Sequence, residues 1–272
     1  LAIRVLHRAV PEVPQVACFD TSFHATLPAA AATYAIPQSW SARWSIRRFG
    51  FHGLSHAWAS KRAAVILGRP LEELRLVVAH LGAGASLAAV HGGRSVDTTM
   101  GFTPLEGLVM ATRCGTVDPG LVLWLTRHAG VDIDELERVL ETKSGLLGLS
   151  GLSGDFRDVL AAADLGSADG RLAYSVYLHR LVAGVAAMAA AMNGLDGVVF
   201  TAGVGEGSAR LRSDTCAGLG FLGVALDETA NGQGRGDRNI SAADAAVSVL
   251  VVHAREDLEI ARSVAALLSG LR

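Results

Sequence analysis

Two short apolar segments of the sequence run directly into glycine-rich turns. Residues 74–79 (LRLVVA) lead into HLGAG at 80–84, and residues 197–201 (GVVFT) lead into AGVGEG at 202–207. Apolar runs of this length are typical of buried strands, and glycines after them let backbone N–H groups converge on an anion. Either turn alone is more often a plain tight turn, but the pair favours phosphate binding. Neither is a Walker loop or a dinucleotide fingerprint, because the further residues of those motifs do not follow.

The rest of the chain alternates strands and helices. Further strands are predicted at 15–19, 86–90, 94–98 and 247–252, the middle two forming a hairpin around His91-Gly92-Gly93. Helices are predicted at 1–9, 55–67, 118–128, 132–142, 172–192, 208–219 and 256–268. The Gly/Ser-rich residues 144–154 predict a loop, and 21–45 an irregular segment. The alternation predicts an α/β chain with a mixed sheet.

Composition excludes several classes of protein. Of the 272 residues 50% are hydrophobic and 18% charged, which is enough to build a globular core. The net charge of -2 argues against a nucleic-acid partner. Three widely spaced cysteines fit a reducing cytoplasm better than a disulfide framework. The longest apolar stretch, 172–192, carries Arg180 near its middle, so we expect no membrane span.

The segment ATRCGTVDPG (111–120) contains a candidate anion-binding arginine. Arg113 stands beside glycine in a stretch with little other charge, as expected of an anion clamp or a transition-state stabiliser. A structural Arg113–Asp118 ion pair is the alternative. Cys114 is a poor candidate nucleophile, because the sequence supplies no obvious base.

Three acidic residues have both a functional and a structural interpretation. Asp155 opens DFR (155–157), which could grip a nucleoside or could cap a helix above a buried Phe156. Asp20 at the end of a predicted strand could bind a metal, act as a base or cap a helix. Glu256 stands where the dipole of the last helix favours a negative charge.

The segment RRFGFHGLSH (47–56) has the composition of neither a surface loop nor a core strand. It places two arginines, two histidines and two phenylalanines around two glycines. His52 and His56 are four residues apart, but no HExxH motif or cysteine pair accompanies them, so we expect no zinc site here.

Six segments in this order closely resemble those of the acetate kinase family. They are FDTSFHATLP, RRFGFHGLSH, VVAHLGAGASLAAV, DTTMGFTPLEGLVMATRCGTVDPG, SGLSGDFRDV and VVFTAGVGEGSARLR. The resemblance covers about residues 11–265. It implies a ribonuclease-H-like (actin-like ATPase) α/β fold with duplicated domains. It also implies a cytoplasmic homodimer that transfers a phosphoryl group from ATP to acetate with Mg²⁺, or with Mn²⁺ in its place, giving acetyl phosphate and ADP.

The resemblance also assigns roles to individual residues. Asp20 matches the family's catalytic aspartate, His52 and Arg113 its transition-state stabilisers, and Glu256 its Mg²⁺ ligand. A carboxylate nucleophile needs no general base, so Asp20 is expected to orient Mg²⁺ or its waters. Three further segments match its nucleotide-binding residues: His80, Leu81, Gly82, Ala83 and Gly84; Asp155, Phe156 and Arg157; and Gly203, Val204, Gly205, Glu206 and Gly207.

The sequence also departs from the family. Ala83 and Gly207 replace asparagines of the usual HLGNG and GIGEN, which puts nucleotide preference in doubt. The family's opening strand, its phosphate loop and a segment with a substrate arginine are absent, and the chain starts without Met. We therefore expect most of an N-terminal lobe to be missing, with 1–24 and 257–272 as its remnant and 25–256 as a nucleotide-binding and dimerisation domain.

Two alternatives stay open at this point. The chain could be an inactive nucleotide-binding or dimerising fragment, or it could be a propionate or butyrate kinase of the same family. The sequence alone fixes neither the acyl chain length nor the nucleotide preference nor the physiological direction.

Overall fold

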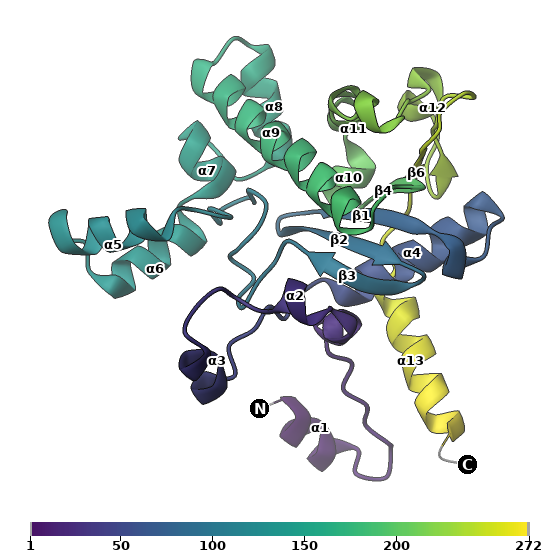
Figure 1. The fold of residues 1–272 in the computed structure, drawn as a ribbon, viewed down its shortest axis with the longest axis horizontal. Helices are drawn as coiled ribbons and strands as arrows, with labels where there is room; N and C mark the ends of the chain where they lie inside the picture. Colours follow the sequence, from purple (N-terminus) through teal and green to yellow (C-terminus); the bar gives the residue numbers. More distant parts are fainter. Residues whose placement is uncertain (1, 271–272) are drawn as a thin grey trace.

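The computed structural model describes residues 2–270, and in them the strands form one six-stranded mixed sheet in the order β3-β2-β1-β4-β6-β5 (Figure 1). The parallel strands β1, β4 and β6 are joined on one side by the antiparallel hairpin β2–β3 and on the other by β5. Their bounds are β1 Arg75–Leu81, β2 Ala85–His91, β3 Arg94–Thr98, β4 Gly197–Thr201, β5 Arg238–Asn239 and β6 Ser248–Val251.

Helices surround this sheet and extend from it. The α-helices are α1 Ala2–Ala9, α2 Ala29–Ala32, α3 Gln38–Trp44, α4 Gly53–Leu67, α5 Pro119–His128, α6 Ile133–Thr142, α7 Gly145–Ser150, α8 Phe156–Asp164, α9 Ala168–Ala191, α10 Ala202–Gly207, α11 Ala209–Gly218, α12 Glu228–Gly232 and α13 Glu256–Gly270. Short 3₁₀ turns lie at Ser22–Thr26, Leu71–Glu73 and Gly220–Leu222.

The two faces of the sheet carry separate hydrophobic clusters. Along β1 the side chains alternate: Val77 faces one cluster and Val78 the other, as the two-residue period of a strand requires. The long helix α9 packs on the first face and α4 on the second (Figure 1). By length and composition α9 could span a membrane, but Leu181, Val185 and Met188 are buried in the first cluster, as in a core helix.

Most predicted elements are confirmed, with small shifts at their ends. The hairpin β2–β3, helices α5 and α6 with their Asp118 and Asp132 N-caps, and helix α9 lie where the pattern placed them. Helix α4 ends at Gly68 as expected, but it begins at Gly53, two residues before the predicted Ser55.

Four predictions of local structure are wrong. Residues 21–45 are not irregular throughout, because the short helices α2 and α3 lie within them. Residues 15–19 are not a strand; within residues 2–270 no strand pairs with them, and an unpaired strand leaves its backbone groups unsatisfied. Residues 144–154 are not a loop throughout, because helix α7 lies within them and buries Leu146 in the core. The turn at 202–207 is itself a short helix, α10. Because residues 15–19 form no strand, Asp20 lies in a turn rather than at a strand end.

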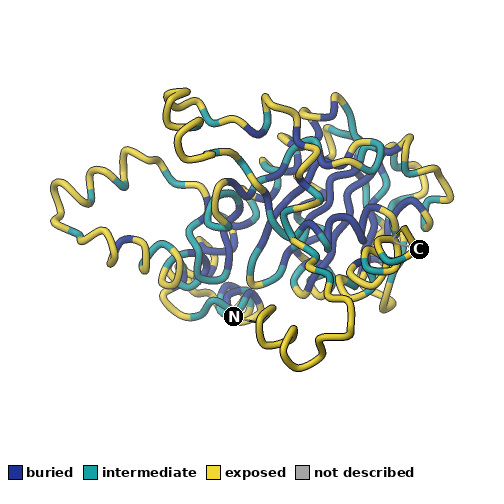
Figure 2. Tube along the Cα trace, turned by 90° about the horizontal axis from the view of Figure 1, so that it is seen from below, coloured by how far each residue is buried: buried dark blue, intermediate teal, exposed yellow. Residues whose placement is uncertain are grey.

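The N-terminal residues of the described chain are exposed. Residues 3–15 are exposed along their length, whereas the central strands β1, β2 and β4 are largely buried (Figure 2). Helix α13 starts beside the sheet and extends away from it (Figure 1). Leu81 and Thr201, at the ends of β1 and β4, are by contrast buried in the body of the protein.

Candidate active site

His52 is held at the start of α4 by Asp20. The backbone N–H of His52 donates to Asp20 Oδ2 at 2.6 Å, and that of Leu54 donates to Oδ1 at 3.2 Å. These bonds satisfy first-turn N–H groups, which is the capping role considered for Asp20. His52 itself has φ 56°, a left-handed conformation that costs a non-glycine residue about 1–3 kcal/mol. Strain of this kind is typical of functional positions, where the surrounding structure maintains it.

His52, Arg113 and Gly84 meet at one point. A Cβ placed on Gly84 would lie 3.2 Å from His52 Nε2 and 3.6 Å from Arg113 Nη1. The His52 ring also stacks on His80, with centroids 4.1 Å apart. Burial, first of all, together with the nearby Arg113, lowers the pKa of His52, although the charge of Asp20 acts in the opposite direction. The imidazole of His52 and the guanidinium of Arg113 therefore face the same small space.

Arg113 keeps most of its donors free. Its Nη1 lies 3.4 Å from the Pro104 carbonyl and 3.7 Å from Met110 Sδ. Among the described residues it forms no ion pair, and Asp118 instead accepts from Gly120 N at 2.8 Å as the cap of α5. The alternative of a structural Arg113–Asp118 pair is therefore wrong. Burial raises the pKa of the neighbouring Cys114 thiol, which disfavours a thiolate nucleophile.

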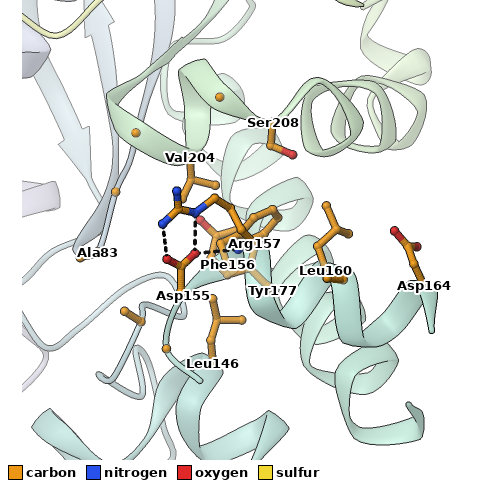
Figure 3. Close-up of a pocket in the computed structure, with 16 residues that line it drawn as sticks. Ala83, Leu146, Asp155, Phe156, Arg157, Leu160, Asp164, Tyr177, Val204 and Ser208 are labelled. Carbon is orange, nitrogen blue, oxygen red and sulfur yellow. Dashed lines mark hydrogen bonds and ion pairs between the residues drawn. The ribbon is translucent and has the colours of Figure 1, made fainter. Parts of the chain in front are cut away.

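A pocket of about 640 Å³ adjoins this point. All three predicted nucleotide-binding segments contribute to it, through Gly82, Ala83, Asp155, Phe156, Arg157, Gly203, Val204 and Gly207. Its other walls come from α7, α8 and α9, through Leu146, Leu160, Ala161, Asp164 and Tyr177. Val204 and Ser208 lie across the pocket from Leu146 (Figure 3). Segments that are far apart in the sequence thus converge on one cavity.

Asp155 and Arg157 form a two-point ion pair at this pocket (Figure 3). Arg157 Nε lies 3.0 Å from Asp155 Oδ1 and Nη2 lies 2.5 Å from Oδ2, which lowers the pKa of Asp155 to about 2. Asp155 also caps α8, accepting from Arg157 N, while Phe156 packs against Tyr177 with centroids 5.3 Å apart. The capping interpretation holds, and both side chains of the ion pair still line the cavity.

The segment at α10 also combines strain with open space. Ala202 has φ 65°, and a Cβ on Gly203 would meet nothing within 4 Å, because the pocket lies there. Gly205 instead packs on β1 and β4, and Glu206 turns away to bond His253 Nδ1 at 2.5 Å and Ala254 N at 3.0 Å. Gly203 and Gly207 thus face the pocket, whereas Gly205 and Glu206 hold α10 in place.

The remaining residues of the first glycine turn lie outside the pocket. Leu81 is fully buried in the core, and His80 Nδ1 lies 2.8 Å from Ser55 Oγ. The turn is tied to the arginine segment by the bond from Ala111 N to the Ala83 carbonyl, at 3.0 Å.

Residues 1–262 match the model of the acetokinase family. The chain belongs to that family. It is 55% identical over 252 residues to the acetate kinase of Gloeobacter violaceus, covering 93% of this chain and 62% of that protein. The structure matches Porphyromonas gingivalis acetate kinase with a TM-score of 0.94 at 38% identity, covering 98% of this chain and 67% of that one. It matches a Francisella tularensis propionate kinase with a TM-score of 0.89 at 39% identity, covering 95% and 66%.

These matches confirm the predicted family and its actin-like α/β fold. This acetokinase-family chain spans less than two thirds of the length of the Gloeobacter relative.

Asp20, which accepts a hydrogen bond from the backbone N–H of His52, and Glu256 interact through their charges in this acetokinase-family chain. Burial, first of all, and then the charge of Asp20 raise the pKa of Glu256, so the two acidic groups are close enough to repel. A divalent cation between such groups would relieve that repulsion. Among the described residues no group of three or more His, Cys, Asp or Glu side chains gathers as a metal site. Mg²⁺ commonly uses only one or two protein carboxylates together with waters and phosphates, so this pair fits it.

Sequence reasoning missed several residues of the site. Leu160 and Tyr177 line the pocket, but on the helical pattern they were indistinguishable from core residues. Ser86 contacts the rings of both His52 and His56 from inside the sheet. A lone serine in an apolar strand carries no sequence signal for such a position, although its polar hydroxyl amid aliphatic neighbours is a weak hint.

Proposed function

We propose that this chain carries out the acetate kinase reaction, the reversible transfer of a phosphoryl group from ATP to acetate to give acetyl phosphate and ADP. The observation that carries the proposal is the meeting of His52 and Arg113 at Gly84, directly beside the pocket lined by Gly82 and Ala83. Family membership and the acetate kinase relatives support the same reaction.

The chemistry follows from the charges involved. An acetate carboxylate is already a nucleophile, so no residue has to remove a proton from it. The phosphoryl group in flight spreads negative charge over its oxygens, and donors fixed in advance stabilise that charge more than they stabilise the ground state. Arg113 supplies free guanidinium donors and His52 an imidazole, both facing the position of Gly84.

Asp20 and Glu256 would hold Mg²⁺, with Mn²⁺ as a possible substitute, directly or through waters. The ion would supply positive charge against the phosphates. Asp20 has both oxygens engaged by backbone N–H groups, which fixes the carboxylate but leaves lone pairs for further bonds.

The pocket would hold the nucleotide, with ATP as substrate. Its apolar wall from Leu146, Phe156 and Tyr177 suits a base, and the open backbone at Gly203 suits the approach of a phosphate. Ala83 and Gly207 supply no side-chain amide to this pocket. We therefore propose a broader nucleotide preference than an asparagine at either position would give.

We also propose the domain division 1–24 plus 257–272 against 25–256, a cytoplasmic location and a homodimer. Residues 1, 271 and 272 of that division lie outside the described residues. Exposed apolar side chains support further packing partners, since Trp40, Trp44 and Trp124 are each more than half exposed. A soluble monomer in sedimentation experiments would contradict the dimer.

The direct test is an acyl-hydroxamate assay on protein whose intact mass has been measured. Acetate with ATP and Mg²⁺ should give acyl phosphate, and Arg113→Ala should abolish it. The matched control is Arg127→Ala on the exposed face of α5. ADP binding without acyl phosphate would favour the inactive-fragment alternative. Faster turnover of propionate or butyrate would favour a propionate or butyrate kinase, and the structural match to a propionate kinase is the reason to test these substrates.

A further inference from the structure

Ser86 lies between the rings of two histidines. Its Oγ is 3.0 Å from His52 Nδ1 and 2.7 Å from His56 Nε2. Ser86 and His56 are both completely buried, Ser86 on β2 and His56 on the first turns of α4. The other nitrogen of His52, Nε2, faces Gly84 and Arg113. Three side chains thus form a line from the core to the proposed reaction site.

The ring of His56 carries a single proton on nitrogen, because burial first of all, and then the neighbouring histidines, hold its pKa well below the ordinary value. A neutral imidazole has one N–H donor and one bare acceptor nitrogen. The serine hydroxyl has one proton, so it can donate to only one of the two rings and must accept from the other.

The unpartnered nitrogen of His56 determines which atoms donate and which accept in the two hydrogen bonds of Ser86. His56 Nδ1 is buried and has no hydrogen-bond partner within residues 2–270. If Nδ1 carried the proton, a buried N–H would be left without an acceptor, which is costly and rare. The proton therefore sits on Nε2 and is donated to Ser86 Oγ. The serine proton then points to His52 Nδ1, which leaves the proton of His52 on Nε2.

We propose that Ser86 and His56 are positioning residues that keep the single proton of His52 on Nε2, aimed at the space between Gly84 and Arg113. This inference rests on the proposed function for its catalytic meaning, because a bare Nε2 lone pair would repel a phosphoryl oxygen that an N–H attracts. The hydrogen bonds from His56 to Ser86 and from Ser86 to His52 are a property of the folded chain and can be tested without measuring turnover.

A second serine–histidine pair provides a matched control. Ser95 Oγ lies 2.8 Å from His24 Nδ1, and both residues are almost completely buried. His24 Nε2 lies 3.0 Å from the Phe51 carbonyl, which can only accept, so this ring is fixed by its own backbone contact. Ser95→Ala removes the same atom from the same kind of bond as Ser86→Ala, but at a ring that does not face Gly84.

The test is ¹⁵N NMR of the histidine rings in the whole chain at neutral pH. In the wild-type protein His52 and His56 should each show a protonated Nε2 and a bare Nδ1. Ser86→Ala should turn His52 into a mixture of tautomers, and Ser95→Ala should leave His52 unchanged. A wild-type His52 protonated on Nδ1 would overturn the proposal, and so would a His52 spectrum that Ser86→Ala does not alter. Because the wild-type spectrum needs no variant, misfolding of Ser86→Ala cannot hide the answer.

Turnover gives a separate measurement. If the chain makes acetyl phosphate, Ser86→Ala should lower kcat roughly fivefold to tenfold with KM for ATP unchanged, as the loss of about one hydrogen bond in the transition state alone predicts. Ser95→Ala should leave kcat unchanged. Equal kcat values in wild type and Ser86→Ala would overturn the positioning role. A wild-type chain without activity would refute the proposed function. The tautomer spectra would still show whether Ser86 and His56 keep the proton of His52 on Nε2.

Discussion

Mild acid should destabilise this protein through its buried histidines. His24, His52, His56 and His80 all have lowered pKa values, with burial as the largest cause for each. These rings therefore stay neutral in the folded chain at a pH where the unfolded chain protonates them. Stability should be fully present above the ordinary histidine pKa of 6.5 and be lost as pH falls below it.

The magnitude can be worked out for His80, whose pKa is lowered to about 3. Between about pH 7.5 and about pH 5.5 the folded ring binds almost no proton, whereas the unfolded ring becomes mostly protonated. Integrating that difference gives a loss of about 1.4 kcal/mol in the free energy of unfolding from this one ring. The other three rings act in the same direction. The combined loss is a large fraction of the free energy of unfolding of a typical domain, which is about 5–15 kcal/mol.

Urea denaturation at the two pH values measures the loss. His80→Asn keeps a polar group toward Ser55 and should reduce the pH-dependent loss by about 1.4 kcal/mol relative to wild type. The matched control is His128→Asn at the exposed end of α5, which should leave the loss unchanged. A wild-type free energy of unfolding that is flat over this range, or a His80→Asn loss equal to that of wild type, would show that burial does not keep the His80 ring neutral.

Three further changes test other contacts. Gly84→Ala places a methyl group 3.2 Å from His52 Nε2, so kcat for acetyl phosphate should fall about 100-fold with little change in Tm; an unchanged kcat would contradict the shared site. Ser167→Ala removes the N-cap of α9 and should cost about 1 kcal/mol by urea denaturation, whereas Ser167→Asn should cost little. Arg212→Met leaves the Gly205 and Glu206 carbonyls without their buried donor and should cost about 3 kcal/mol; a wild-type melting curve would argue against its role in anchoring α10.

The sequence predicted the sheet well because its strands carry their own signal. β1 and β4 are apolar runs bounded by glycine, and the hairpin at His91 has turn residues at its tip. Residues 15–19 have the same apolar character but form no strand, since a strand also needs a neighbour to pair with. Local composition does not reveal that neighbour. It does not reveal α7 either, because this helix depends on the packing of Leu146 in the core.

The site was predictable only as a set of segments. Motif resemblance singled out His52, Arg113 and the glycine turns, but not which atoms face one another. The structure shows Gly84 between His52 and Arg113, and it shows Glu206 turned away toward His253. Ser86 could not be found from the sequence, because its importance comes from two rings that reach it from α4.

We propose that three distant glycine-containing segments form one nucleotide pocket beside His52 and Arg113. Titrating the chain with ADP and Mg²⁺ while following the backbone amide signals of Gly82, Gly154 and Gly203 tests it most directly. All three residues line the pocket, so their signals should shift together and give a single Kd. Signals that shift with different Kd values, or a shift at one segment alone, would contradict the account.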